Sequence, residues 1–423
     1  MHKHTVLDNK LNVISSRMRG MASVSLGVWI KVGGRYETEQ RSGISHLVEH
    51  MLFKGTPSRS AKKLKQSIEG VGGAFNGFTS DEVTCYMVKV PAKHTELGLD
   101  VLSDMVLRAK FSPTDLAREK FVIYEEIKMY KDQPSEHVLE LLAELMWPGN
   151  ALGRPLTGTI DSVRAIKRQH LADFRNTYYH SGNMSVVSAG DVDHVELGRL
   201  SAKYFSKCRS VENPGFDAPA ISRGASRVRF ARGNVKQAHI AMGFYCDAGT
   251  NRERLAVKLM SIILGGNMSS RLFDGLREER GLCYDISSAY KKHSDVGEVQ
   301  IHAGVDNGKA VSAVTAIIDE LKKIADRGVS PGELTRAKEY AKGQFLLAIE
   351  GTSTRMLWMG DRFLTHGGIP DVKKVVDEID SLSGKDIRKA ARDVFTPGSA
   401  NLALVSRVGT KEKQAIRRQV SRL

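Results

Sequence analysis

The sequence predicts an α+β protein made of two homologous halves, each an antiparallel-rich sheet covered by helices. Two observations carry this prediction. The chain repeats itself at offsets of 216 or 218 positions, and strand-like and helix-like stretches are intermixed in the same order in both halves. Such mixing is typical of layered α+β domains. Two similar halves facing each other would enclose a chamber.

The duplication rests on segments that occur in the same order in both halves. Three pairs are similar: 112–119 with 330–337, 27–37 with 243–253, and 183–187 with 401–405. Between the halves, residues 209–225 are rich in Pro, Gly, Asn and Asp, which is typical of a linker. We therefore expect an N-terminal half at 1–208 and a C-terminal half at 226–423.

Strands are expected where apolar and β-branched residues gather between turn signals. Residues 23–32 and their counterpart 238–245 both have this character, and a further strand is expected at 83–90. Gly72 and Gly73 suggest a hairpin-like turn before that strand.

Composition excludes several classes of protein. With 423 residues, 41% hydrophobic and 26% charged, the chain resembles an ordinary globular protein and not a disordered or collagen-like one. The four cysteines form no CxxC pair, so neither a disulfide framework nor a thiolate zinc site is indicated.

The first 20 residues lack the apolar core of a leader, and the longest apolar-leaning stretch is too short to cross a membrane. We expect a cytoplasmic protein without a membrane span.

Net charge is the unusual quantity, at +15 with a pI near 9.5. A surplus of this size suits either a nucleic acid or acidic-lipid partner, or a solvated basic surface. The charges are dispersed along the chain, which favours the second interpretation and no nucleic acid partner. Residues 407–423 are the exception, with six basic side chains and one acid, and they suit either an interaction arm or a plain helical end.

The strongest local signal lies within residues 43–55. Apolar residues at helical spacing predict an amphipathic helix: Ile44, Leu47, Val48, Met51 and Leu52. His46 and His50 are four positions apart, so both imidazoles face one side of this helix and can reach a single zinc ion, with Glu49 beside them. This is the H-x-x-E-H order of the inverzincins. The alternative is a pair of solvated surface histidines.

A catalytic zinc also needs a third protein ligand. A second helix is expected from Ser112, and on it Glu119 and Glu126 are seven positions apart and share a face. Glu125 points about 100° away from that face.

The second half lacks this acidic and imidazole set. Ala337 and Gln344 stand where the first half has Glu119 and Glu126, and the counterpart of the histidine helix, residues 257–266, has no His or Glu. A structural requirement would apply to both halves. The asymmetry therefore favours a chemical role for the His and Glu residues of the first half.

With these motifs, the sequence resembles the pitrilysin-type, mitochondrial-processing-peptidase-like zinc peptidases over essentially its whole length. The resemblance implies one Zn²⁺ per chain, bound by His46, His50 and Glu126. It further implies that Glu49 is the general base and that Glu119 is an additional acidic residue supporting the site.

Other residues are assigned by the resemblance alone. Arg277 and Tyr284 match an Arg and a Tyr with which the family completes the site from its C-terminal half. Residues 276–284 by themselves indicate only a helix that stops at Gly281. The segment from residue 72 resembles an edge strand to which substrate adds itself by main-chain hydrogen bonds; an ordinary Gly-rich hairpin is the alternative. The substrate-binding residues expected there are Ala74, Phe75 and Asn76.

The function implied is zinc-dependent endopeptidase activity on peptides or unfolded polypeptides, with Glu49 taking a proton from the attacking water. The chain holds both the zinc-motif residues and the Arg277 and Tyr284 pair, which favours a self-sufficient enzyme that forms a homodimer. The alternative is a non-catalytic or scaffold partner subunit, which the same family contains. Cleavage of basic leader peptides would call for an acidic chamber, which a net charge of +15 does not by itself promise.

Overall fold

The computed structural model of the protein describes residues 2–221 and 224–423. It divides into two compact units, each with one sheet and its covering helices. The first unit comprises the chain up to Ile127 together with Arg154–Asp217 and Leu346–Ile369. The second comprises Lys128–Gly153, Ala218–Phe345 and Pro370–Leu423. The predicted two-domain α+β class is confirmed.

The first unit contains a six-stranded sheet in the order β1-β2-β6-β3-β5-β4. The pairing of β2 with β6 is parallel and the other pairings are antiparallel. Its strands are β1 (Lys3–Val6), β2 (Asn12–Arg17), β3 (Ser23–Ile30), β4 (Ala74–Thr79), β5 (Thr84–Pro91) and β6 (Met184–Gly190).

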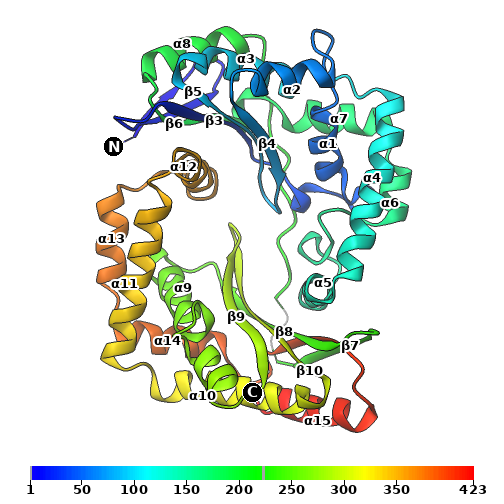
Figure 1. Ribbon diagram of the computed structural model, residues 1–423, viewed down its shortest axis with the longest axis vertical. Helices are drawn as coiled ribbons and strands as arrows, with labels where there is room; N and C mark the ends of the chain where they lie inside the picture. The colour runs from blue at the N-terminus through cyan, green and yellow to red at the C-terminus, as the bar shows by residue number, and fades with distance from the viewer. Residues whose placement is uncertain (1, 222–223) are drawn as a thin grey trace. The chain divides into compact units, whose positions relative to one another are not determined.

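Helices cover both faces of this sheet (Figure 1). On one face α3 packs against β3 and β5, and α8 against β2. The helices of the first unit are α1 (Ile44–Leu52), α2 (Ala61–Glu69), α3 (Thr95–Arg108), most of α4 (Pro113–Asp132), α6 (Ile160–Ala165), α7 (Arg168–Tyr178), α8 (His194–Phe205) and α12 (Thr352–His366).

The second unit repeats the pairing scheme of the first. Its sheet has the order β7-β11-β8-β10-β9, with a parallel pair of β7 and β11 followed by antiparallel pairs. This is the scheme β2-β6-β3-β5-β4 again, which supports the duplication inferred from sequence. The strands are β7 (Arg227–Arg232), β8 (Gln237–Asp247), β9 (Cys283–Lys292), β10 (Val296–Asp306) and β11 (Asn401–Ser406).

The helices of the second unit also follow the order of the first. They are α5 (Pro134–Met146), α9 (Asn251–Gly265), α10 (Ala310–Arg327), most of α11 (Pro331–Ala348), α13 (Val372–Asp380), α14 (Gly384–Val394) and α15 (Thr410–Val420). Helix α15 shows that the basic C-terminal segment is largely helical.

The compact units differ from the sequence halves, because two equivalent helices are exchanged. Helix α5 begins at Pro134 and α12 at Thr352, 218 positions later. Yet α5 packs on β8 and β11 of the second sheet, and α12 packs on β3 and β6 of the first (Figure 1). The boundary expected at 209–225, which includes residues 222–223 outside the described part of the chain, stays a prediction about the sequence halves. Each compact unit also contains one helix of the other half.

The residues of β3 explain how α12 docks. Alternate positions of the strand face opposite sides of the sheet, and the side opposite α3 carries Ser25, Gly27 and Trp29. A Cβ at Gly27 would lie 2.6 Å from the sulfur of Met356. Ser25 also exchanges a hydrogen bond of 2.9 Å with Thr352. Small residues on this side of the strand let the helix approach closely.

The hairpin-like turn expected at Gly72 and Gly73 is placed differently. Gly72, with a φ of +75°, lies in the turn that joins α2 to β4 and not in a hairpin. The hairpin between β4 and β5 turns at residues 80–83, where the Ser80 amide donates to the Val83 carbonyl at 2.8 Å.

Candidate metal centre

Helix α1 presents the histidines, and its start is held by a buried carboxylate. Glu37 accepts hydrogen bonds from the amides of Gly43 (2.7 Å) and Ser45 (2.8 Å), which satisfies donors that every helix leaves unpaired at its N-terminus. Gly43 has a φ of +90°, a conformation that favours glycine. Burial raises the pKa of Glu37 to about 7, although these hydrogen bonds act in the opposite direction.

The predicted apolar face of α1 is buried in the core of the first unit, as its helical spacing predicts. Because side chains three and four positions apart share a face, His46, Glu49 and His50 project from the other side. The two imidazole rings stand 4.5 Å apart between centroids in an edge-to-face arrangement.

Helix α4 brings Glu126 to these histidines. The Nε2 atom of His46 lies 3.7 Å from Oε1 of Glu126, and Nε2 of His50 lies 3.9 Å from Oε2. Zinc bonded to imidazole and carboxylate at roughly 2.0–2.2 Å holds its ligand atoms on the order of 3–4 Å apart. Among the described residues, His46, His50 and Glu126 form the group of His, Cys, Asp or Glu side chains whose ligand atoms could hold a metal ion, since these atoms all lie within 4.8 Å of one another. The donor set and the distances fit zinc.

Burial prepares one imidazole for this role. Burial, together with the nearby charge of His50 as a smaller cause, lowers the pKa of His46 to about 4. A histidine binds metal as the neutral imidazole, so His46 is in the ligating form at neutral pH.

Glu49 lies on the same face of α1. Burial raises the pKa of this carboxyl above its ordinary value, an effect that His50 and a hydrogen bond from Thr79 oppose and that Glu126 reinforces. The hydroxyl of Thr79, on β4, donates to Oε2 of Glu49 at 3.4 Å. A carboxylate with a raised pKa is a better proton acceptor, which is what a general base requires.

Glu119 lies behind His50 and is largely buried. A hydrogen bond of 3.2 Å joins His50 Nδ1 to Glu119 Oε2. The other carboxylate oxygen lies 2.7 Å from Nζ of Lys54. Glu125, by contrast, is exposed on the far side of α4, as the helical phase predicts.

The predicted substrate strand borders this cluster. Strand β4 is an edge of the first sheet and pairs with β5, and no strand of the described residues pairs with its outer side. Ala74 and Asn76 are exposed, whereas the ring of Phe75 packs against Phe53 with centroids 5.4 Å apart. Gly77 also lies beside the cluster, because a Cβ there would be 3.0 Å from Oε1 of Glu49.

Arg277 and Tyr284 belong to the second unit. Arg277 lies in a π-helical turn, Phe273–Glu278, with its guanidinium 4.6 Å from the centre of the Phe273 ring. Tyr284 lies near the start of β9, an edge strand, and is 73% exposed. The structure thus places eight predicted site residues in the first unit, the five of the cluster and the three on β4, and these two in the other.

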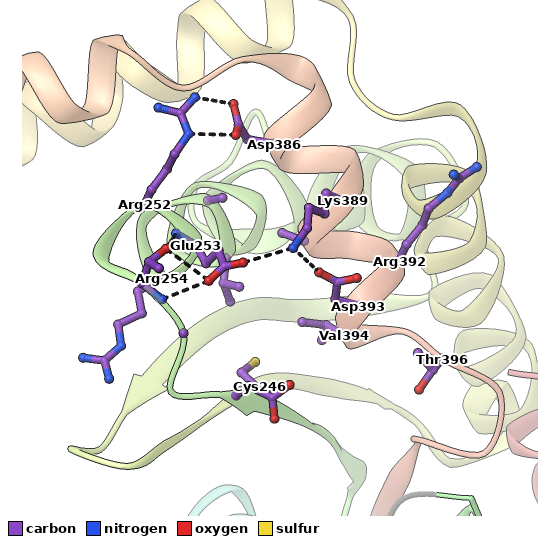
Figure 2. A pocket seen from close by; sticks show the side chains of 16 residues that line it. Cys246, Arg252, Glu253, Arg254, Asp386, Lys389, Arg392, Asp393, Val394 and Thr396 are labelled. Carbon is purple, nitrogen blue, oxygen red and sulfur yellow. Dashed lines mark hydrogen bonds and ion pairs between the residues drawn. The ribbon is translucent and has the colours of Figure 1, made fainter.

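A cavity of about 600 Å³ lies in the second unit between α9 and α14 (Figure 2) and contains none of the predicted site residues. Its charged side chains largely pair with one another. Arg252 contacts Asp386 at 2.7 Å, and Lys389 contacts both Glu253 (3.1 Å) and Asp393 (2.9 Å). The pairs of Arg252 with Asp386 and of Lys389 with Glu253 join the two helices, which indicates a structural role.

Sequence reasoning missed three residues that support the cluster: Glu37, Lys54 and Thr79. Lys54 had a signal, because it continues the four-residue spacing of His46 and His50. Thr79 and Glu37 had none, because their contacts depend on how a strand and a loop pack against α1.

The fold and the cluster define a two-domain α+β protein with a candidate metal centre in its first unit. Comparison with family models gives two matches. Residues 12–160 match the insulinase family (Peptidase family M16), and residues 165–340 match the Peptidase M16 inactive domain.

Relatives are similar in sequence along nearly the whole chain. An uncharacterized zinc protease of Bacillus subtilis, YmxG, is 33% identical over 97% of this chain and 99% of its own length. An uncharacterized zinc protease of Streptomyces coelicolor is 34% identical over 93% of this chain and 87% of its own. The chain therefore belongs to peptidase family M16.

Solved structures show the same fold. A protease from Helicobacter pylori matches with a TM-score of 0.90 at 20% identity, over 96% of this chain and 99% of that one. A protein from Pseudomonas fluorescens, described as a peptidase M16 inactive domain, matches with a TM-score of 0.88 at 16% identity, over 96% and 98%. Among the described residues, no helix combines the length and apolar character needed to span a membrane.

Proposed function

We propose that this protein is a zinc-dependent endopeptidase that hydrolyses peptide bonds in short or unfolded polypeptides. The observation that carries the proposal is the convergence of His46, His50 and Glu126, with Glu49 on the same face of α1. Three protein ligands leave a coordination position open, which is typical of catalytic zinc sites. Membership of a peptidase family and the names of its zinc protease relatives support the reaction class.

Each residue of the cluster has its own role in the proposed reaction. Zinc, when bound, supplies a Lewis acid that favours ionisation of water near neutral pH. Glu49 accepts the proton of the attacking water and then delivers it to the leaving amine. Its raised pKa suits both steps, because it holds the proton more readily than an exposed carboxylate does. His46, His50 and Glu126 hold the ion, one per chain.

The substrate strand and the second unit complete the proposal. An extended peptide adds to the free edge of β4 by main-chain hydrogen bonds, which give affinity with little sequence preference. Tyr284 donates a hydrogen bond to the oxygen that gains charge in the tetrahedral transition state, and Arg277 contacts the substrate backbone. These assignments of Arg277 and Tyr284 rest on family resemblance, with the exposure of Tyr284 as support.

The competing proposal is a non-catalytic or scaffold subunit of a processing-peptidase-like complex. The described residues favour an enzyme, because the complete ligand set, the base and the Arg and Tyr all occur in one chain. We therefore propose activity without a different subunit, as a homodimer. Light scattering on the purified chain measures the assembly state directly.

The deciding experiment compares wild type, Glu49→Gln and the matched control Glu125→Gln. Zinc content is measured by elemental analysis, and activity with an unstructured quenched peptide before and after chelation. We expect about one zinc per chain in all three proteins, with cleavage lost in Glu49→Gln, kept in Glu125→Gln and abolished reversibly by the chelator. Zinc without cleavage in wild type would favour the subunit alternative, and absence of zinc would overturn the proposed metal centre.

A further inference from the structure

Lys54 lies in the turn directly after α1, where its amide donates to the Met51 carbonyl at 3.2 Å. It is four positions beyond His50 and projects toward α4. Its ammonium Nζ lies 2.7 Å from Oε1 of Glu119. The same carboxylate accepts a hydrogen bond from His50 through its other oxygen. The three side chains thus form a chain of contacts from a lysine to a proposed metal ligand.

The contact with His50 determines which imidazole nitrogen is free. An ionised carboxylate can only accept hydrogen bonds, so Nδ1 of His50 carries the proton and Nε2 keeps its lone pair. Nε2 is the atom that faces Glu126, at 3.9 Å. A carboxylate behind a ligating histidine fixes its tautomer and ring orientation in this way in many metal sites.

Glu119 needs a partner to remain in place. Its side chain is only 8% exposed, and a buried carboxylate is costly unless it is paired. Glu49 and Glu126 add two further carboxylates to the same region. Among the ion pairs of the described residues, Lys54 is the lysine or arginine that contacts Glu119.

The duplicated half argues against a purely structural role for this pair. Ala337 occupies the position of Glu119 in the second unit and is likewise buried, on the equivalent helix α11. The scaffold therefore forms without a carboxylate at this position.

We propose that Lys54 is a positioning residue for the metal centre: it holds Glu119 so that His50 presents Nε2 to zinc. This inference rests on the proposed zinc site, but it concerns metal affinity and not peptide cleavage.

The test measures the zinc dissociation constant by competition with a chromophoric chelator. We expect Lys54→Met and Lys54→Gln to weaken zinc binding by about 10-fold to 100-fold, the usual cost of losing an outer partner of a metal ligand. Lys54→Arg, which keeps the charge, should restore most of the affinity. The matched control Lys65→Met changes an exposed lysine of α2 and should leave affinity unchanged.

A double-mutant cycle separates positioning from a general effect on stability. In a Glu119→Gln background, Lys54→Met should cause little further loss, because the group it holds has been replaced. Circular dichroism of the zinc-free variants checks that each is folded. Wild-type affinity in both Lys54→Met and Lys54→Gln, or a full additional loss in the Glu119→Gln background, would overturn the inference. A wild type that binds no zinc would instead remove the proposed function on which it rests.

Discussion

His50 and Glu119 are joined by a hydrogen bond of 3.2 Å between Nδ1 and Oε2. The two residues come from different helices, α1 and α4, so this bond connects the histidine motif to the helix that also carries Glu126. It leaves one imidazole nitrogen of His50 directed at the cluster. The geometry of the candidate centre therefore depends on the packing of α4 against α1 as well as on the motif itself.

Replacing Glu119 should weaken metal binding without removing a proposed ligand. We expect Glu119→Gln to bind zinc about 10-fold to 100-fold less tightly than wild type, because His50 loses the charged partner that orients it. Chelator competition measures the effect, and Glu125→Gln on the exposed side of α4 is the control. Equal affinities for wild type and Glu119→Gln would show that the hydrogen bond does not tune the site.

Gly77 should be required for activity. A Cβ at this position would lie 3.0 Å from Oε1 of Glu49 and 3.1 Å from the ring of Phe53, so one of them must move. We expect Gly77→Ala to reduce peptide hydrolysis by on the order of 10-fold, because a small displacement of a catalytic group is costly, with zinc content unchanged. Gly198→Ala is the control, since nothing lies within 4 Å of its added Cβ. Full activity in Gly77→Ala would contradict the placement of Glu49.

The docking of α12 should be sensitive to Gly360. A Cβ there would lie 2.1 Å from the Trp29 ring, far inside van der Waals contact. We expect Gly360→Ala to lower the free energy of unfolding by about 1–3 kcal/mol through overpacking. Gly343→Ala on α11, where the added Cβ meets nothing within 4 Å, should instead be neutral or stabilising because alanine favours helix. Urea denaturation distinguishes these results, and equal effects of the two substitutions would contradict the tight contact.

Glu37 should make stability depend on pH. Its pKa in the folded protein is about 7, raised above the ordinary 4.5 by burial, so the folded state disfavours the charged form. The wild type should therefore lose stability relative to Glu37→Gln as pH rises from 4.5 to 7, by roughly 3 kcal/mol in total. Urea denaturation of both proteins at pH 5 and pH 7.5 tests this. A stability difference that does not change with pH would show that Glu37 has no raised pKa.

Much of the fold and of the candidate centre follows from local patterns. The spacing of Ile44, Leu47 and Val48 defines a helix with one buried face, and the same geometry directs His46 and His50 to the other face. The helical period also predicts that the neighbouring side chains of Glu125 and Glu126 point in different directions, so that only Glu126 faces the histidines. These inferences succeed because a helix fixes the directions of side chains three and four positions apart, whatever the rest of the protein does.

Other contacts have no local signature. Thr79 meets Glu49 because β4 lies beside α1, and Glu37 caps α1 because a loop returns to its N-terminus. Lys54 follows the spacing of the histidines, but its partner Glu119 is 65 positions away. Contacts of this kind depend on tertiary packing, which residue spacing does not specify.

The sequence by itself determined the duplicated α+β architecture, the histidine helix and the acidic face of α4, because repeats and short-range periodicity are written directly in the order of residues. Only the tertiary structure decided which sheet each of the equivalent helices α5 and α12 covers. An amphipathic helix requires an apolar surface but does not specify which one. Here the close fit of Gly360 against Trp29, between residues far apart in the chain, makes that choice for α12.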